Sequence, residues 1–195
     1  MFSYFAIYKP YKMLSQFVRM PKKKCLADLD FAFPEGTNAL GRLDENSEGL
    51  LILSNDKQLN HLLLKPENKH KRTYWVQVGG IVTEDELKKL EQGIIIKLET
   101  GDYLTKPCIA KLIDEPAFLP PRKHPIQPQH KTCWIELTLT EGKFHQVRKM
   151  TAAIGHQTMR LLRISIEDLQ LTELTPGRVQ VLKREEIYSL LKIPV

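Results

Sequence analysis

One acidic residue in this sequence lies where a rigid fold could hold it for chemistry. Asp44 belongs to a polar loop within residues 39–56, which read ALGRLDENSEGLLILSND. Residues 50–53 form a short continuous apolar run, which predicts a buried strand directly after the loop. With Glu45 or Glu48, Asp44 would offer the two carboxylates of a glycoside hydrolase, although adjacent loop acids rarely have that geometry. The same residues also fit an ordinary turn, so the segment alone leaves these interpretations open.

The composition describes a globular protein and favours a polyanionic partner. The chain has 195 residues, of which 42% are hydrophobic, enough for one sizeable core that can be divided into two lobes. Lysine and arginine outnumber aspartate and glutamate by 29 to 23, giving a net charge of +6 that suits nucleic acid. The chain has no run of 18 apolar residues, and its start, MFSYFAIYKP, lacks the features of a signal peptide. We therefore expect a cytoplasmic protein.

Cysteine and histidine give no sign of a metal or redox site. The three cysteines, Cys25, Cys108 and Cys133, are odd in number and widely spaced, without a Cys-x-x-Cys or zinc-type grouping. The six histidines are scattered, and His124 and His130 lie in a proline-rich segment without acidic partners. We expect reduced cysteines and no structural metal.

Local patterns predict strands and helices around the Asp44 loop. Asn55 or Asp56 can cap a helix that ends before Pro66. A second helix begins at the capping box of residues 83–86 and ends near Gly93. Apolar or alternating runs predict strands at residues 5–8, 50–53, 74–78, 94–96, 108–113, 134–140, 161–167 and 169–181.

A second group of polar residues follows the predicted strand 134–140. Residues 141–143, Glu-Gly-Lys, form a turn, and a helix is predicted from Phe144 to Gly155 because apolar residues recur at helical spacing. Arg148 lies off the apolar face of this helix. By itself it is an ordinary surface arginine.

Residues 115–131, EPAFLPPRKHPIQPQHK, are too rich in proline to form a helix or a central strand. Loops of this length are usually functional or disordered, and Arg122, Lys123 and Lys131 would suit contact with RNA. We expect an ordered functional loop, with a floppy insertion as the alternative.

These motifs together resemble those of the RsuA-type pseudouridine synthases, in the right order from about residue 5 to residue 181. The chain departs from the family in having Tyr8 for an Asn, Arg72 for a Lys, and Glu167 for a Gly, so a local bend at residue 167 can differ. The matching motifs are Tyr8-Lys9-Pro10-Tyr11, Gly41-Arg42-Leu43-Asp44, Ser47, Gly49-Leu50-Leu51, Asn55-Asp56, Arg72-Thr73-Tyr74, Glu141-Gly142-Lys143 and Gln146-Val147-Arg148-Lys149-Met150.

The resemblance implies an α+β fold with a mixed, largely antiparallel sheet in two lobes, flanking helices and a central RNA-binding cleft. It implies a single catalytic domain over residues 1–195. The first lobe, to about residue 70, would carry the catalytic loop, and residues 71–195 would form the second lobe. No S4 domain, the small RNA-binding module of many relatives, is expected.

The resemblance also implies the chemistry. Asp44 would be the catalytic residue, either as a nucleophile or as the base that removes a ribose proton. Arg148 would lie beside it, because a guanidinium holds and orients a carboxylate, and Tyr74 would stack on the target base. The family needs no cofactor and no metal.

The implied partner is RNA. The group of relatives that this sequence most resembles modifies a uridine in large-subunit (23S) ribosomal RNA. Small-subunit rRNA or tRNA is the alternative substrate, and a non-catalytic RNA-binding protein is a further one. We expect a monomer. The predicted RNA contacts, for which a solvated charged surface is the alternative, are Arg42, Lys9, Arg72, Lys143, Gln146 and Lys149.

Overall fold

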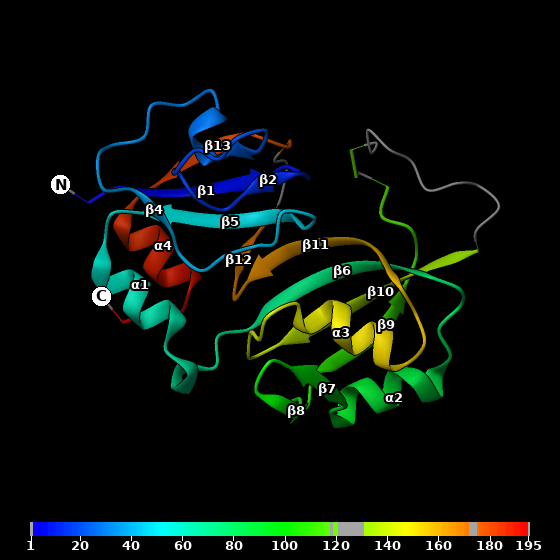
Figure 1. Cartoon of the computed structure of the whole chain (residues 1–195). Coiled ribbons are helices and arrows are strands. Elements are labelled where there is room, and N and C mark those ends of the chain that lie inside the picture. The colour runs from blue at the N-terminus through cyan, green and yellow to red at the C-terminus, as the bar shows by residue number, and fades with distance from the viewer. Residues whose placement is uncertain (1, 118, 121–130, 172–174, 195) are drawn as a thin grey trace. The chain divides into compact units, whose positions relative to one another are not determined.

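The chain forms two compact units, seen in a computed structural model that describes residues 2–117, 119–120, 131–171 and 175–194 (Figure 1). Unit 1 comprises Met1–His70 and Leu162–Val195, and unit 2 comprises Lys71–Leu161. The boundary near residue 70 agrees with the prediction. The assignment of residues 71–195 to a single second lobe is wrong, because the last strands and helix of the chain pack in unit 1. Among the described residues, no helix is long and apolar enough to cross a membrane.

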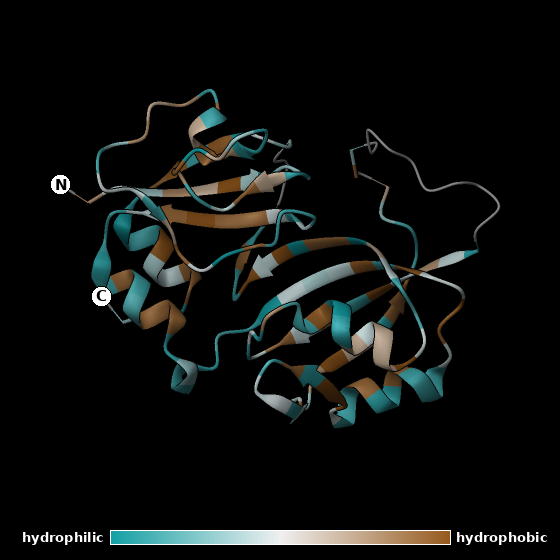
Figure 2. Cartoon of the chain, viewed as in Figure 1, coloured by the Kyte–Doolittle hydropathy of each residue, from teal (hydrophilic) through white to brown (hydrophobic). Residues whose placement is uncertain are grey.

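Unit 1 is built on a mixed sheet centred on β5 (Glu48–Ser54), all of whose residues are buried. This agrees with the apolar run predicted to be a strand, and Figure 2 shows the hydrophobic colour along β5. β5 pairs antiparallel with β1 (Tyr4–Lys9) and parallel with the end of β11 (Thr158–Ile166). On its other side β1 pairs with β13 (Val179–Leu182). The shorter elements are β2 (Met13–Leu14), β3 (Lys24–Cys25), η1 (Leu26–Asp28), β4 (Asn38–Ala39), η2 (Pro66–Asn68) and β12 (Leu169–Gln170).

Asp56 ties the helices α1 (Lys57–Leu64) and α4 (Arg184–Leu190) to the first strand. As predicted, it caps α1, and its Oδ1 accepts from two backbone N–H groups of the first turn at 2.9 and 3.2 Å. Its Oδ2 accepts from Tyr4 Oη at 2.8 Å and from Tyr188 Oη at 2.9 Å. Burial alone would raise the pKa of Asp56, but the hydrogen bonds from the two tyrosines hold it below its ordinary value.

Unit 2 contains an antiparallel sheet in which β10 (Thr132–Leu139) lies between β6 (Arg72–Gly79) and β9 (Ile109–Ile113). A separate hairpin is formed by β7 (Ile95–Leu98) and β8 (Gly101–Leu104). The sequence did not predict β8, whose residues alternate too weakly to be recognised. α2 (Glu84–Gln92) packs against β9, and α3 (Gln146–Ala153) packs against β7.

The helices of unit 2 begin in two different ways. α2 has the predicted capping box, in which Thr83 Oγ1 accepts from the Glu86 N–H at 3.3 Å and Glu86 Oε2 accepts from the Thr83 N–H at 2.8 Å. α3 begins at Gln146, two residues later than predicted. His145 has a left-handed φ of 54°, so it and Phe144 lie outside the helix.

Two further predictions concern loops. Residue 118 and residues 121–130 lie outside the described part of the chain, so the prediction of an ordered functional loop remains untested. Glu167 has a φ of 48°, so the backbone adopts the left-handed conformation that glycine favours. Its carboxylate pairs with His70 Nδ1 at 3.4 Å and with Lys192 Nζ at 3.5 Å.

Candidate active site

The loop that carries Asp44 is held on both sides in unit 1. Before Asp44, the buried Leu43 donates its N–H to Ser15 Oγ at 3.1 Å, and its carbonyl accepts from the same hydroxyl at 2.7 Å. After Asp44, the N–H of the buried Ser47 donates to the Asp44 carbonyl at 3.0 Å and closes a turn. The Asp44 side chain is half-buried. A loop fixed in this way can present one carboxylate in a defined orientation.

The ammonium group of Lys9 is enclosed in the same unit. The side chain is fully buried, and Nζ donates to the carbonyls of Pro10 at 2.9 Å and Met13 at 2.7 Å. Burial lowers the pKa of Lys9 to about 7, and the negative charges of Glu48 and Asp44 oppose this effect. This placement disagrees with the predicted RNA contact, because an enclosed amine does not reach a phosphate. Lys9 instead supports the chain that follows β1.

β5 and β11 approach closely at Gly49, shortly after Asp44. Gly49 has a φ of 104°, and a Cβ on it would lie 2.3 Å from the carbonyl oxygen of Arg163 and 2.8 Å from its nitrogen. The buried Arg163 side chain donates from Nε to the Leu50 carbonyl at 2.8 Å. The sequence did not predict that Arg163 supports this region, because its partner Leu50 is 113 residues away in the chain and local sequence patterns do not indicate such a contact.

Tyr74 and Arg72 lie on β6 in unit 2. The Tyr74 side chain is 9% exposed and faces Leu137 of β10 in the strand register, while the half-buried Arg72 faces Leu139. A tyrosine in this position contributes to packing between the two strands. Its low exposure leaves a small part of the side chain available to a ligand.

Arg148 lies in the first turn of α3, off the buried face formed with Val147 and Met150, as predicted. Its side chain is half-buried. It borders an open pocket of about 410 Å³ on unit 2, whose other lining residues are Ala152, Gly155, His156, Gln157 and Thr158. The predicted arginine is therefore placed at a cavity and not on an unbroken surface.

A network around Glu141 fixes the start of α3. Glu141 accepts hydrogen bonds from Tyr103 Oη at 2.5 Å, from the Lys106 N–H at 2.9 Å and from Gln146 Nε2 at 2.7 Å. Gln146 Oε1 in turn accepts from the Lys143 N–H at 2.8 Å. Gln146 is buried with both ends of its amide engaged, so this placement disagrees with its prediction as an RNA contact.

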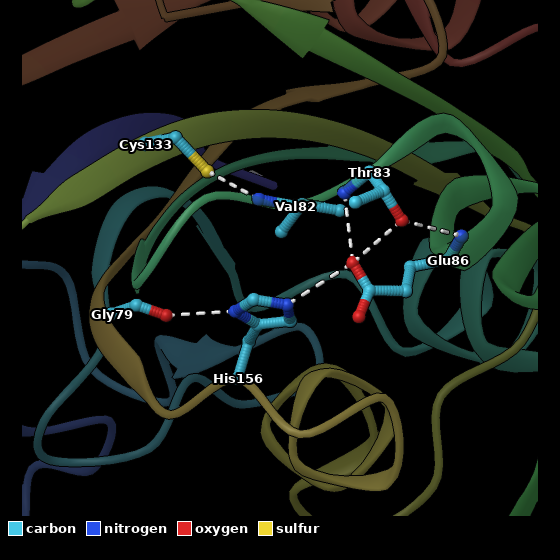
Figure 3. Close-up of polar contacts among 6 residues, drawn as sticks. All are labelled: Gly79, Val82, Thr83, Glu86, Cys133 and His156. Carbon is cyan, nitrogen blue, oxygen red and sulfur yellow. Dashed lines mark hydrogen bonds and ion pairs between the residues drawn. The ribbon is translucent and has the colours of Figure 1, made fainter.

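His156 fixes the other end of α3 (Figure 3). Its Nδ1 lies 2.8 Å from the Gly79 carbonyl at the end of β6, and its Nε2 lies 3.3 Å from Glu86 Oε2 at the start of α2. Hydrogen bonds from the Thr83 backbone and side chain, followed by His156, lower the pKa of Glu86. Beside this contact, the Val82 N–H donates to Cys133 Sγ at 3.3 Å. The scattered histidines of the sequence gave no signal for this role.

The structure places the predicted site residues in two groups. Asp44 belongs to unit 1, with the buried Lys9 and the exposed Arg42. Unit 2 holds the remaining ones, which are Tyr74, Arg148, Arg72, Lys143, Gln146 and Lys149. The convergence of Asp44 with Tyr74 and Arg148 stays a prediction, because these residues lie in different units. In the described part of the chain, no group of three or more His, Cys, Asp or Glu side chains is placed to hold a metal ion.

Comparisons with known proteins identify relatives of this chain. Residues 3–153 match the family described as RNA pseudouridylate synthase. A ribosomal large subunit pseudouridine synthase E from Xanthomonas axonopodis pv. citri is 41% identical over 172 residues, covering 86% of this chain and 87% of that protein. The protein of the same name from Vibrio parahaemolyticus is also 41% identical, over 87% of this chain and 69% of its own length.

A solved structure has the same fold. The crystal structure of a pseudouridylate synthase superposes with a TM-score of 0.80 at 26% identity, covering 97% of this chain and 74% of that one. The predicted α+β fold, with its mixed sheet and flanking helices, is confirmed by this match.

Proposed function

The chain belongs to the RNA pseudouridylate synthase family, and from this premise we propose that it isomerises one uridine of large-subunit (23S) ribosomal RNA to pseudouridine. Family membership makes the chain an isomerase. One observation carries the choice of substrate: four proteins named for the large ribosomal subunit are 39–42% identical to it over 86–89% of its length.

The proposed reaction moves the uracil ring without a redox step. The N1–C1′ bond breaks, the ring turns, and C5 bonds to C1′, while C5 loses a proton and N1 takes one up. Asp44 acts either as the nucleophile or as the base that removes a ribose proton. The hydrogen bonds that hold the Asp44 loop on both sides support this role, because a catalytic carboxylate must be preorganised.

The target uridine must leave its stack before the carboxylate can reach it, as in other enzymes that modify bases. Tyr74 supports the extruded base, and Arg148 orients Asp44. The anchoring of α3 supports the role of Arg148. Glu141 holds the start of this helix and His156 holds its end, so the arginine is carried on a fixed element.

RNA is bound outside the reacting centre by the remaining cationic side chains. Arg42 and Lys143 are exposed, and Arg72 and Lys149 are half-buried, so each has a surface that a phosphate can reach. Lys9 and Gln146 are removed from the predicted contacts and support the two loops instead. The substrate is 23S rRNA, and the enzyme acts as a monomer in the cytoplasm.

Tritium release tests the catalytic proposal. RNA labelled at uridine C5 is incubated with wild type, Asp44→Asn and the control Asp30→Asn, whose side chain is exposed in the same unit. We expect release by wild type and the control, and none by Asp44→Asn. Release that survives Asp44→Asn, or is absent from wild type, contradicts the proposal. Comparing 23S rRNA with 16S rRNA and tRNA tests the substrate, because labelled 23S rRNA alone is expected to react.

The role of Arg148 is tested separately. Arg148→Ala is expected to reduce turnover while largely keeping RNA affinity at moderate salt, because an orienting residue acts on the reacting carboxylate. The exposed Arg178→Ala serves as the matched control. Equal losses of turnover and affinity in Arg148→Ala would identify a phosphate contact instead.

A further inference from the structure

Two aromatic side chains, the exposed Phe144 and the half-buried His145, directly precede α3. Phe144 is 64% exposed, although it is a large apolar residue in a loop of an enzyme with a well-formed core. The ring of His145 is stacked against it, with ring centroids 3.9 Å apart and an angle of 18° between the planes. The sequence assigned both residues to the helix. Because Phe144 lies outside the helix, it does not pack on the apolar face of α3 as a helical residue would.

This aromatic pair is held on a fixed loop. Glu141 and Gln146 bind each other and the surrounding backbone, as described above, and together they span residues 141–146. The hydrogen bond to Glu141 raises the pKa of Tyr103 to about 12, so this phenol remains a donor throughout the neutral range. His145 has a left-handed φ of 54°, a conformation that is uncommon for a residue with a Cβ. The stacked pair of rings, of which Phe144 is the exposed one, is therefore preorganised.

Two lysines lie close to the pair, Lys149 against the Phe144 ring and Lys143 next to Phe144 in the chain. Lys149 Nζ lies 5.4 Å from the centroid of the Phe144 ring, and Lys143 Nζ lies 4.7 Å from that of Tyr103. Exposed rings interleaved with cations are the arrangement that binds single-stranded nucleic acid, in which bases stack on aromatic side chains and phosphates meet cations. A protein partner has less to gain here, because an isolated exposed ring offers little apolar area to bury.

We propose that Phe144 and His145 form a stacking platform for an unpaired base of the substrate RNA, and that Lys143 and Lys149 bind its phosphates. Arg148 lies in the first turn of α3, four residues after Phe144 in the chain, so the stacked base belongs to a nucleotide that flanks the target uridine. This last step rests on the proposed function. The platform itself requires only that the chain binds RNA with unpaired bases.

Binding of two fluorescein-labelled RNAs tests the platform. One is decauridylate, whose bases are unpaired, and the other is a blunt ten-base-pair RNA duplex, whose bases are not available for stacking. We expect Phe144→Ala to weaken decauridylate binding by about 5-fold or more and to leave duplex binding unchanged. Phe144→Tyr keeps a ring and is expected to bind as wild type does. Ile95→Ala, at a residue of unit 2 that is 59% exposed, is the matched control.

The lysines are tested by their salt dependence. Lys149→Gln is expected to weaken the binding of both RNAs. For decauridylate, the slope of log affinity against log salt concentration should fall in magnitude by about 0.7, the effect of one lost phosphate contact. Lys88→Gln is the control, because Lys88 lies on α2 in the same unit and pairs with Asp85 at 3.4 Å. An unchanged slope in Lys149→Gln contradicts the phosphate contact.

Three results would contradict the platform. Phe144→Ala could bind decauridylate as well as wild type does, or it could lose affinity equally for decauridylate and for the duplex. The third is wild-type affinity for decauridylate in Phe144→Leu, a variant that keeps an apolar side chain without a ring. Thermal unfolding confirms that each variant is folded. The assay involves no turnover, so it separates the two proposals. Wild type that releases no tritium but shows the Phe144 effect would refute the proposed reaction alone. Active wild type without the Phe144 effect would refute the platform alone.

Discussion

Replacing Gly49 with alanine is expected to destabilise unit 1 strongly, because β5 and β11 leave no space for a side chain there. The added Cβ would lie 2.3 Å from the Arg163 carbonyl oxygen, 2.8 Å from its nitrogen and 3.0 Å from its carbonyl carbon. All three are backbone atoms of a paired strand, so the clash is relieved only by moving β5 or β11. The φ of 104° at Gly49 adds strain for any residue with a Cβ.

The magnitude follows from two separable contributions. The unfavourable backbone conformation costs about 1–2 kcal/mol, and forcing extra volume into a packed contact costs about 1–3 kcal/mol. We therefore expect a loss of about 2–5 kcal/mol in the free energy of unfolding. Two other glycines separate the contributions. Gly101 has a φ of 113° with no atom within 4 Å of its would-be Cβ, and Gly142 has equally open space without a positive φ.

Urea unfolding followed by circular dichroism measures the three variants against wild type. Gly101→Ala is expected to lose about 1–2 kcal/mol, the backbone contribution alone, and Gly142→Ala to change by less than about 1 kcal/mol. Gly49→Ala should lose clearly more than Gly101→Ala. Equal losses in these two variants would refute the reasoning, because they would show that the close approach to Arg163 has no energetic consequence. We also expect reduced tritium release by Gly49→Ala, since β5 follows the Asp44 loop.

Other perturbations follow from single contacts. Asp56→Asn is expected to lower the free energy of unfolding, measured in urea at pH 7, by about 2–4 kcal/mol. Because the pKa of Asp56 is lowered in the folded state, this difference in stability from wild type should shrink as the pH falls below about 4. A difference that stays constant with pH would contradict this. The pKa of Lys9 is about 7 in the folded protein, so above pH 7 the unfolded chain binds one proton more than the folded chain. The free energy of unfolding of wild type should therefore rise relative to that of Lys9→Met between pH 7 and about 10. Parallel pH profiles would exclude a buried titrating amine. Tyr103→Phe removes a hydrogen-bond donor to Glu141 and should lower the free energy of unfolding by about 1–3 kcal/mol. Backbone amides of β8 should then exchange faster with solvent, and unchanged exchange would show that this hydrogen bond does not stabilise the hairpin.

Features that depend on neighbouring residues could be predicted from the sequence. Asp56 caps α1 because a short acceptor precedes an apolar helical pattern, and Thr83 with Glu86 forms a capping box at the expected spacing. The buried strand β5 follows from its continuous apolar run. The family motifs added the fold class and the candidate Asp44, which local patterns alone describe as a turn.

Features that depend on distant contacts could not be predicted. Lys9 was predicted to contact RNA for its positive charge, but its side chain is buried and its Nζ donates to the carbonyls of Pro10 and Met13. Gln146 was predicted to contact RNA as part of the matching motif 146–150, but it is buried and its Nε2 donates to Glu141 Oε1. The return of residues 162–195 to unit 1 depends on the pairing of β13 with β1, which join opposite ends of the chain. No local pattern records such a pairing.

The path of the chain also sets an order for folding during synthesis. Unit 2 is one continuous segment, whereas unit 1 needs both Met1–His70 and Leu162–Val195. As the chain emerges from the ribosome, β1 and β5 can pair early, but the contact of Gly49 with Arg163 forms only after unit 2 has been made. We therefore expect a nascent chain to form α3, which carries Arg148, before β11 and β13 complete the sheet that contains β5. The enzyme would become active only when its last segment joins its first.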